Sequence, residues 1–480
     1  MRCAQPLRDH ERYYLEEVNF EKRVTIMQVM GQEEKVKYMT TAPVRGLVCR
    51  LAVPTIISML VTSFYNMADT FFVGKINTSA TAAVGVVFSL MAMIQAVGFF
   101  FGQGSGNIIS RKLGAQKYEE ASVYAATGFG CAFASGVIIL ILGLIFLEPL
   151  SYILGSTETI LPYTKQYLWI ILLGAPFMTS SLVLNNQLRY QGSAAYAMVG
   201  IVSGAVLNIF LDPFLIFTCH MGISGAAIAT VSSQVVSFFL MLAGTGKGGN
   251  IKLSLRNFSF SWDYIGSIMK NGFPSLCRQG LASFSVMALN HAAAVYGDAA
   301  IAGMSIVNRV TMFANSALIG FGQGFQPVCG MNYGAGRYKR VREAYWFCVK
   351  YAFFFLLAVA VISFAGAEQI ISVFRKGDPE VTAAGTLALR FQMVVFPLGS
   401  WLVMCNMMLQ SIGRSAKASV VAAARQGVFF IPLVMILPRF FGLLGVQMCQ
   451  MWADICAFVL SVPLGISVLR EFREDREEKA

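Results

Sequence analysis

Apolar stretches of nearly uniform length follow one another along the chain and are separated by short polar turns. A helix needs about 20 apolar residues to cross a bilayer, because about 30 Å of hydrocarbon is crossed at 1.5 Å per residue. Two of the stretches, 265–295 and 299–330, are rich in Gly, Asn and Gln. The pattern predicts an all-α polytopic membrane protein with twelve transmembrane helices, at about residues 48–73, 82–107, 121–147, 160–184, 193–217, 223–245, 265–295, 299–330, 344–367, 383–408, 418–437 and 443–469.

The sequence nearly repeats itself at a spacing of 220–221 residues: "FGQGSGNIISRKLGAQKYEEA" (101–121) aligns with "FGQGFQPVCGMNYGAGRYKRV" (321–341). Each half holds six predicted helices, an even number, so both halves enter the membrane from the same side. We therefore expect two six-helix lobes related by a pseudo-twofold axis along the membrane normal, an arrangement typical of transporters. The expected parts are an N-terminal extension (1–45), a first lobe (46–246), an inter-lobe loop (247–264), a second lobe (265–469) and a tail (470–480).

Composition agrees with a membrane protein, since 56% of the residues are hydrophobic and only 13% are charged. Soluble domains carry roughly 25% charged residues. The net charge of +12 would suit nucleic acid, but the basic residues gather in the loops of one side. The other side's loops hold Lys75, Arg375, Lys376 and Arg439. The positive-inside rule then puts the extension, the inter-lobe loop and both termini in the cytoplasm and explains the basicity without a nucleic-acid partner.

Residues for metal binding or catalysis are scattered. The ten cysteines form no CxxC pair, and His10, His220 and His291 lie far apart in the sequence. Neither a Gly-rich phosphate loop nor a Ser/His/Asp set of convincing spacing is present. We therefore expect no cofactor, no metal other than a possible Na⁺, and no enzymatic activity.

Three acidic residues lie well inside predicted helices: Asp69, Asp212 and Asp454. A carboxylate at the bilayer centre costs at least about 2.5 kcal/mol, so such residues usually face a cavity or a partner. Asn208 precedes Asp212 by four residues and shares its helix face. With Thr230, these residues form one band in the outer half of the first lobe, and their oxygens suit H⁺ or Na⁺. Asp454 has no second acid nearby, which leaves a structural and a functional role open.

The second lobe does not repeat the acids. Leu289 occupies the position that matches Asp69, and "FFIPLV" (429–434) replaces the stretch around Asp212. This difference predicts an ion site in the first lobe only.

The chain resembles the multidrug and toxic compound extrusion (MATE) family over about residues 39–470. The resemblance rests on "LAVPTIISMLVTSFYNMADTFFVG", "LNIFLDPFLIF…MGISGAAIAT" and the repeated segments quoted above; "NGFPSLCRQGLASFSV" and "AARQGVFFIPLV" are most similar to its bacterial MepA-like branch. The resemblance implies the MATE fold in a bacterial cytoplasmic membrane. It also implies a cation site at Asp69, Asn208, Asp212 and Thr230.

We expect an antiporter that exports cationic, amphipathic drugs or toxic organic compounds in exchange for H⁺ or Na⁺, acting as a monomer. The 24 Met and 38 Phe residues suit a loose, adaptable cavity. Candidate cavity residues are Gln95, Gln103, Gln279, Gln323 and Arg309. The alternative is a lipid-linked oligosaccharide flippase, which needs a basic cavity for pyrophosphate. It would be favoured if Arg278, Arg309, Arg390 and Arg425 converged on the cavity.

Overall fold

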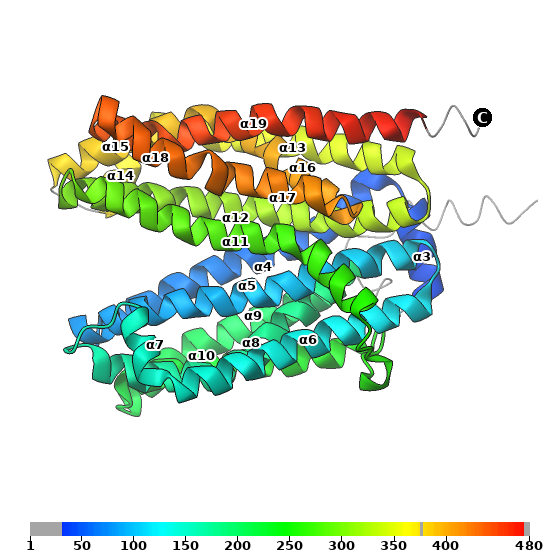
Figure 1. Ribbon diagram of the computed structural model, residues 1–480, viewed down its shortest axis with the longest axis horizontal. Helices are drawn as coiled ribbons and strands as arrows, with labels where there is room; N and C mark the ends of the chain where they lie inside the picture. Colours follow the sequence, from blue (N-terminus) through cyan, green and yellow to red (C-terminus); the bar gives the residue numbers. More distant parts are fainter. Residues whose placement is uncertain (1–30, 375–377, 475–480) are drawn as a thin grey trace, which may run out of the picture.

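Long helices that run side by side build the described part of the protein (Figure 1). The computed structural model describes residues 31–374 and 378–474, and no strand occurs within those two ranges. Most of the predicted N-terminal extension (1–30), the basic pair Arg375 and Lys376, and the end of the predicted tail (475–480) lie outside the described residues.

The first lobe follows a ten-residue helix, α3 (Gln32–Thr41). Each span predicted for this lobe falls on a helix, although α5 and α8 extend several residues beyond the predicted ends, because a helix persists into the polar region where hydropathy falls. A short helix after Phe146, α7, was not predicted. The helices of the lobe are α4 (Val44–Gly74), α5 (Thr78–Gly114), α6 (Tyr118–Ile145), α7 (Leu147–Ile153), α8 (Leu161–Tyr190), α9 (Ala194–Pro213) with the π turn η1 (Phe214–Thr218), and α10 (Gly222–Thr245).

The second lobe begins at Trp262, three residues before its predicted start, where the Ser261 hydroxyl accepts a hydrogen bond from the Asp263 amide (3.4 Å). Two of its spans are interrupted, one by a 3₁₀ turn at Pro397 and one by a π turn. Its helices, after the loop turn η2 (Leu255–Asn257), are α11 (Trp262–Ala294), α12 (Asp298–Gly334), α13 (Tyr338–Ala365), α14 (Ala367–Phe374), α15 (Pro379–Val395), η3 (Phe396–Leu398), α16 (Gly399–Ser411), α17 (Ser415–Ala423), η4 (Ala424–Val428), α18 (Phe430–Phe441) and α19 (Leu443–Glu474).

Within the described residues, ten spans are long and apolar enough to cross a bilayer, judged by length and composition. Helices α11 and α12 fall outside this set, as their Gly, Asn and Gln content suggests. On α6, by contrast, large apolar side chains such as Ile138, Ile141 and Ile145 are exposed. Exposed apolar side chains on a helix whose backbone is fully hydrogen-bonded suit contact with lipid.

A pair of reciprocal contacts reveals the twofold relation between the lobes. A Cβ atom on Gly114, at the end of α5, would lie 2.0 Å from the Met331 carbonyl oxygen of α12. A Cβ atom on Gly334, at the end of α12, would lie 2.0 Å from the Arg111 carbonyl oxygen of α5. A shift of 220 residues converts one contact into the other. Only glycine allows this approach, so the sequence repeat corresponds to a structural axis.

The same repeat appears inside each lobe. In the first, the Asn185 side-chain amide donates to the Ala197 carbonyl (3.4 Å), and in the second Asn406 donates to the Ala418 carbonyl (2.7 Å). Asn406 follows Asn185 by 221 residues, and Ala418 follows Ala197 by the same number, which is the spacing of the sequence repeat. Each lobe therefore anchors its fourth long helix to its fifth in the same way.

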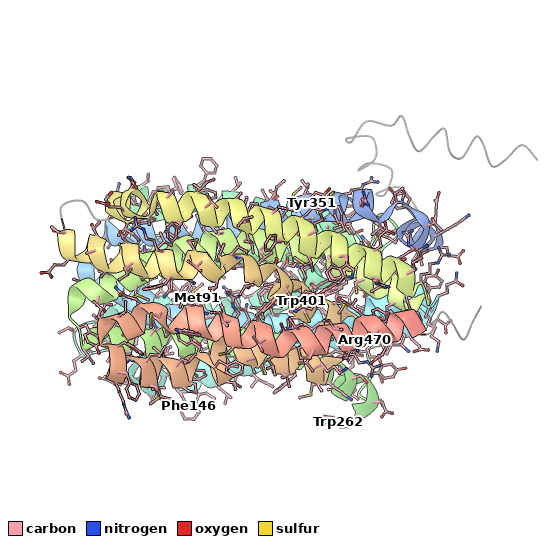
Figure 2. The ribbon with its side chains drawn as sticks, turned by 90° about the horizontal axis from the view of Figure 1, so that it is seen from above. Met91, Phe146, Trp262, Tyr351, Trp401 and Arg470 are labelled. Atoms are coloured by element: carbon pink, nitrogen blue, oxygen red, sulfur yellow. The ribbon has the colours of Figure 1, made fainter. Side chains whose placement is uncertain are left out.

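The two ends of the molecule differ. We call them the α3 end, where α3 and the glycine contacts at Gly114 and Gly334 lie, and the α7 end, where α7 and α14 lie (Figure 1). The ribbons of the lobes meet toward the α3 end and diverge toward the α7 end. Figure 2 shows Trp262 and Arg470 toward the α3 end and Phe146 toward the other.

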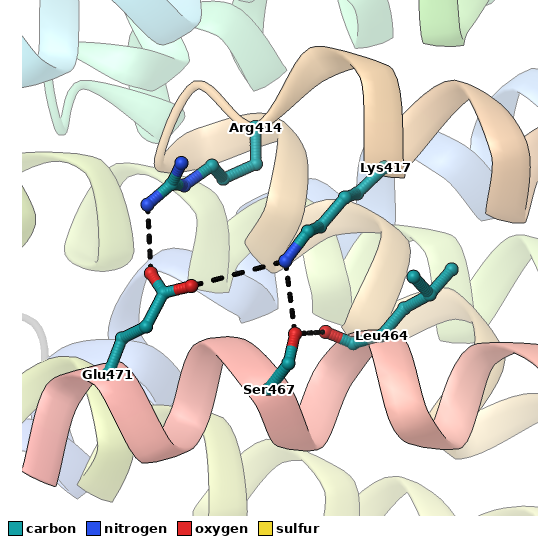
Figure 3. A network of polar contacts seen from close by, with 5 residues as sticks. All are labelled: Arg414, Lys417, Leu464, Ser467 and Glu471. Atoms are coloured by element: carbon teal, nitrogen blue, oxygen red, sulfur yellow. Dashed lines mark hydrogen bonds and ion pairs between the residues drawn. The ribbon is translucent and has the colours of Figure 1, made fainter.

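A polar network connects α19 to the N-terminal end of α17 at the α3 end (Figure 3). Glu471 forms an ion pair with Arg414 (2.8 Å) and lies 4.0 Å from the Lys417 ammonium, which also donates to the Ser467 hydroxyl (3.0 Å). The Arg414 and Glu471 side chains are 50% and 44% exposed, so the pair contributes little to stability. Glu471 lies within α19, so this helix continues into the segment predicted as the tail.

Candidate functional site

A central cavity of about 550 Å³ lies between the two lobes. Helices α4, α5, α8, α9 and α10 line it from the first lobe, and α11, α12 and α15–α19 line it from the second. Much of the lining is apolar and adaptable, and it includes five methionines: Met59, Met91, Met178, Met241 and Met312. Unbranched thioether side chains adapt to ligands of different shape.

Polar side chains are spaced around this apolar lining. The structure places three of the predicted cavity residues there, Gln95, Gln279 and Gln323; their contact with a substrate stays a prediction. Four further glutamines of the lining were not predicted, because glutamine at a helix position gives no sign of which way it faces: Gln234, Gln392, Gln426 and Gln450.

Two predicted cavity residues lie elsewhere. Gln103 is fully buried where the lobes meet, and its side-chain carbonyl accepts a hydrogen bond from the Ser275 hydroxyl of α11 (2.6 Å). Arg309 is exposed and is not among the lining residues, although Asn308 beside it is. The sequence shows both positions as polar, but the rotation of each helix, which the order of residues does not fix, directs them away from the cavity.

The four residues predicted for the ion site come together in the first lobe. Asn208 and Asp212 are buried on α9, and the Asn208 amide lies 3.4 Å from Asp212 Oδ1. Asp69 on α4 is close enough for its charge to act on Asp212. Thr230 is buried on α10. Three helices therefore supply one oxygen-rich cluster, and Asn208 connects it to the lining of the central cavity.

Two tyrosines join this cluster. Tyr65 on α4 and Tyr167 on α8 interact electrostatically with both Asp69 and Asp212, and both lie beside Thr230. Tyr65 is one helical turn before Asp69 on the same face, a spacing that could have indicated it. Tyr167 stands at the start of the apolar stretch of α8, directly after Thr164, Lys165 and Gln166, where a tyrosine gives no signal of a site.

Unpaired oxygens characterise the cluster. Asp69 Oδ1, Asp212 Oδ2 and Thr230 Oγ1 are buried and have no hydrogen-bond partner among the described residues. The same holds for Asn208 Oδ1 and the Tyr167 hydroxyl. Buried polar atoms normally have a partner. Carboxylate, amide and hydroxyl oxygens are ligands for a hard cation, and the two carboxylates also suit a shared proton.

A transition-metal site is not supported within the same residues. No group of three or more His, Cys, Asp or Glu side chains with suitable placement occurs in the described part of the chain. The cluster in the first lobe offers carboxylate, amide and hydroxyl oxygens, whereas sites for zinc or copper favour imidazole nitrogen and thiolate sulfur.

Arginines bring positive charge to the cavity. Arg189 of α8, Arg278 of α11 and Arg425 of η4 are among the lining residues, and that lining includes no Asp, Glu, Lys or His among the described residues. Arg425 is compensated, because its Nε lies 2.9 Å from Asp454 Oδ1. Asp454 is thus the counter-ion of Arg425. The other two candidates for a basic cavity, Arg309 and Arg390, have exposed side chains outside the lining.

Comparisons with known proteins agree with the two lobes. A family model described as MatE matches residues 54–214 and again residues 274–436, once in each lobe. The chain is 27% identical over 431 residues to the "Multidrug export protein MepA" of Staphylococcus haemolyticus, which is 89% of this chain and 95% of that relative.

Solved structures share the fold. One, described as the "Outward-facing conformation of a multidrug resistance MATE family transporter of the MOP superfamily", has a TM-score of 0.85 and 27% identity over 91% of this chain and 98% of its own. A Pyrococcus furiosus transporter described with a "Reverse polarity of binding pocket" that "suggests different function" gives the same values.

The class of protein follows from the two equivalent helical lobes, the cavity between them and these relatives: it is a multi-pass membrane transporter. The chain belongs to the MatE family, since the family model covers most of both lobes, and its relatives are the MepA multidrug export proteins. These relatives are named as exporters, which agrees with a transport function rather than catalysis.

Proposed function

We propose that the protein is a secondary antiporter that exports amphipathic organic compounds in exchange for H⁺ or Na⁺. The observation that carries this proposal is the pair Asp69 and Asp212, two interacting carboxylates in one buried cluster with unpaired oxygens. The adaptable cavity beside it, lined by methionine and glutamine, supports a substrate with apolar surface. The export named for the MepA relatives supports the direction of transport.

Ion binding at this cluster has a direct physical effect. Two charged carboxylates in a buried site repel each other, and uptake of a proton or Na⁺ removes that repulsion. Asp69 and Asp212 stand on α4 and α9, so ion binding changes the packing of those helices. Asn208 contacts Asp212 and also lines the cavity, which links the ion site to the substrate site.

Alternating access would follow from rocking of the two lobes around the cavity. The lobes touch through the glycine contacts at the α3 end. With the orientation predicted by the positive-inside rule, this end faces the cytoplasm, and the described arrangement is closed toward that side. The two lobes of one chain lie on opposite sides of the cavity, and we propose that the monomer is the transporting unit.

The ion site is tested by gradient-driven dye transport in everted membrane vesicles, with rhodamine 123 and fluorescein as cationic and anionic probes. The pH gradient and the Na⁺ gradient are collapsed separately to identify the coupling ion. Asp69→Asn and Asp212→Asn should each lower gradient-driven transport at least tenfold, because an amide neither takes up a proton nor carries a charge for Na⁺.

The matched control is Asp263→Asn, which removes an exposed carboxylate in the first turn of α11. It should transport like the wild type. Thermal unfolding in detergent checks that each variant is folded. Gradient-driven transport at the wild-type rate in both Asp69→Asn and Asp212→Asn would disprove the assignment of the ion site.

A flippase for a lipid-linked oligosaccharide is the second candidate. Arg189 and Arg278 favour it, since guanidinium groups in a cavity suit pyrophosphate. It is weakened because Arg425 is compensated by Asp454, and because Arg309 and Arg390 lie outside the lining. Transfer of a fluorescent lipid-linked sugar across proteoliposomes, without an ion gradient, would favour the flippase over the antiporter.

A further inference from the structure

The cavity carries an excess of positive charge that the export of organic cations does not explain. Its charged lining residues are Arg189, Arg278 and Arg425. The Asp454 carboxylate compensates only Arg425, through contacts of 2.9 and 3.3 Å. Among residues 31–374 and 378–474, two arginines of the lining, Arg189 and Arg278, therefore have no carboxylate partner, and each belongs to a different lobe.

Arg189 belongs to the last turn of α8, so it lies toward the α3 end of the cavity. Its side chain is 2% exposed, and its Nη2 donates to the Asn186 side-chain oxygen (2.6 Å). Its guanidinium lies 5.4 Å from the centre of the Tyr190 ring. Its Nε is buried with no acceptor among the described residues. A buried charge-bearing donor without an acceptor is costly unless a ligand supplies one.

Arg278 of α11 lines the same cavity from the other lobe. Its charge acts on Arg189 and on the Tyr190 hydroxyl, so the two guanidinium groups lie within electrostatic range of one another. Within the described residues it forms no ion pair with a carboxylate. Arg111 of α5 donates to neutral acceptors within the described residues: the Ser411 carbonyl and the Asn271 side chain, each at 3.0 Å, and the Gln410 carbonyl at 3.4 Å.

Electrostatics at this place favours an anion. Like charges repel more strongly in a buried cavity than in water, because the effective dielectric constant is lower. A carboxylate, sulfonate or phosphate relieves that repulsion and accepts hydrogen bonds from two guanidinium forks. A desolvated organic cation in the same place would add to the repulsion.

We propose that Arg189 and Arg278 together bind the acidic group of an amphipathic organic anion, whose apolar part lies against the methionines of the cavity. The proposal rests on the export function proposed above and narrows its substrate class from amphipathic organic compounds to organic anions. Because the two arginines belong to different lobes, the bound acidic group also bridges the lobes at the α3 end of the cavity.

Equilibrium binding of two dyes of similar shape tests the site. Fluorescein is anionic and rhodamine 123 is cationic, and both contain a xanthene ring. With the purified protein in nanodiscs of phosphatidylcholine, Arg278→Gln and Arg189→Gln should each raise the Kd for fluorescein at least tenfold. Arg278→Lys should have a smaller effect because it keeps the charge. Rhodamine 123 should bind Arg278→Gln as well as the wild type or more tightly.

The matched control is Arg309→Gln, an exposed arginine of α12 outside the lining, which should leave fluorescein binding unchanged. Thermal unfolding of each variant separates loss of the site from loss of the fold. Equal fluorescein affinity in wild type, Arg278→Gln and Arg189→Gln would overturn the proposal.

Nanodiscs that contain phosphatidylglycerol distinguish a lipid headgroup from a free organic anion. Displacement of fluorescein by that lipid assigns the site to a lipid phosphate, and unchanged binding assigns it to a free anion. Either result supports an anion site. If fluorescein binds but no gradient-driven transport occurs, the export function is contradicted and the anion site is kept. If rhodamine 123 is transported by the gradient but fluorescein does not bind, the anion site is contradicted and the export function is kept.

Discussion

At the scale of single residues, the second lobe contains a buried ion pair between Arg425 and Asp454. Asp454 is 4% exposed at its side chain and Arg425 is 19% exposed. Gln450 donates a further hydrogen bond to the same carboxylate (2.9 Å). A buried pair of this kind adds little net stability over apolar residues, but removal of one partner leaves the other charge buried and unpaired.

Arg425→Gln should therefore lower the free energy of unfolding by about 3–5 kcal/mol. The double variant Arg425→Gln/Asp454→Asn should recover much of this loss, since it leaves no unpaired charge. Chemical unfolding of the purified protein in detergent, followed by tryptophan fluorescence, measures both. A double variant no more stable than Arg425→Gln alone would contradict the interpretation of Asp454 as a counter-ion.

At the scale of an element, α3 holds the two lobes together at its end of the molecule. On one side the Lys35 ammonium, which is buried, donates to the Ser193 hydroxyl, to the Asn250 side chain (2.7 Å) and to the Gly248 carbonyl (3.2 Å). These partners belong to the first lobe and the inter-lobe loop, and none of them is charged.

The other side of α3 contacts the second lobe. The Met39 carbonyl accepts a hydrogen bond from the Asn332 side chain (3.2 Å), and the Thr40 carbonyl accepts one from Arg337 (2.7 Å). The Met39 side chain is fully buried. The last carbonyls of a helix have no partner within it, and basic side chains stabilise them. Thus α3 connects both lobes, which a ten-residue amphipathic segment does not reveal in the sequence.

The docking of α3 should depend on pH through Lys35. Burial lowers the pKa of Lys35 from 10.5 to about 7. The docked helix therefore binds fewer protons than the undocked helix between about pH 7 and 10.5, and docking becomes more favourable as the pH rises through this window. Below pH 7 both states are protonated, and docking is at its weakest.

Hydrogen–deuterium exchange of the α3 amides, corrected for intrinsic rates, measures this effect. Protection should increase from pH 7 to pH 9 in the wild type and become independent of pH in Lys35→Met. Lys37→Met, which changes an exposed lysine of the same helix, serves as the control and should keep the wild-type dependence. A dependence unchanged in Lys35→Met would exclude Lys35 as its cause.

At the scale of the whole molecule, closure at the α3 end depends on Gly114 and Gly334. An added Cβ atom at either position would lie 2.0 Å from a backbone carbonyl of the other lobe, so the lobes must separate there. Gly114→Ala and Gly334→Ala should both favour the arrangement in which the lobes are separated at the α3 end, because the twofold axis makes the two contacts equivalent. Gly46→Ala, where no described atom outside the local helix backbone lies within 4 Å of the added Cβ, should have no effect.

Distances between spin labels at Lys117 and Lys339, in a background without cysteine, report this separation. Both residues are exposed, in the turn before α6 and in the first turn of α13. The distance distribution should move to longer values in both glycine variants and stay unchanged in Gly46→Ala. Unchanged distances in Gly114→Ala and Gly334→Ala would show that the contact does not limit opening.

The sequence by itself determined the helices, the repeat and the acids of the first lobe. Apolar length, turn residues and the i,i+4 spacing of Asn208 and Asp212 act within one helix, so they are visible in order along the chain. The resemblance to a known family supported the joint assignment of Asp69 and Thr230, which the chain separates by more than 150 residues.

Only the tertiary structure decided which side chains meet across helices. It brought Tyr167 to the carboxylates, placed Arg189 and Arg278 on one cavity, paired Asp454 with Arg425, and directed Gln103 and Arg309 away from that cavity. The physical reason is that the rotation of a transmembrane helix about its axis is fixed by close packing with its neighbours, such as the glycine contacts between α5 and α12, and not by its own hydropathy.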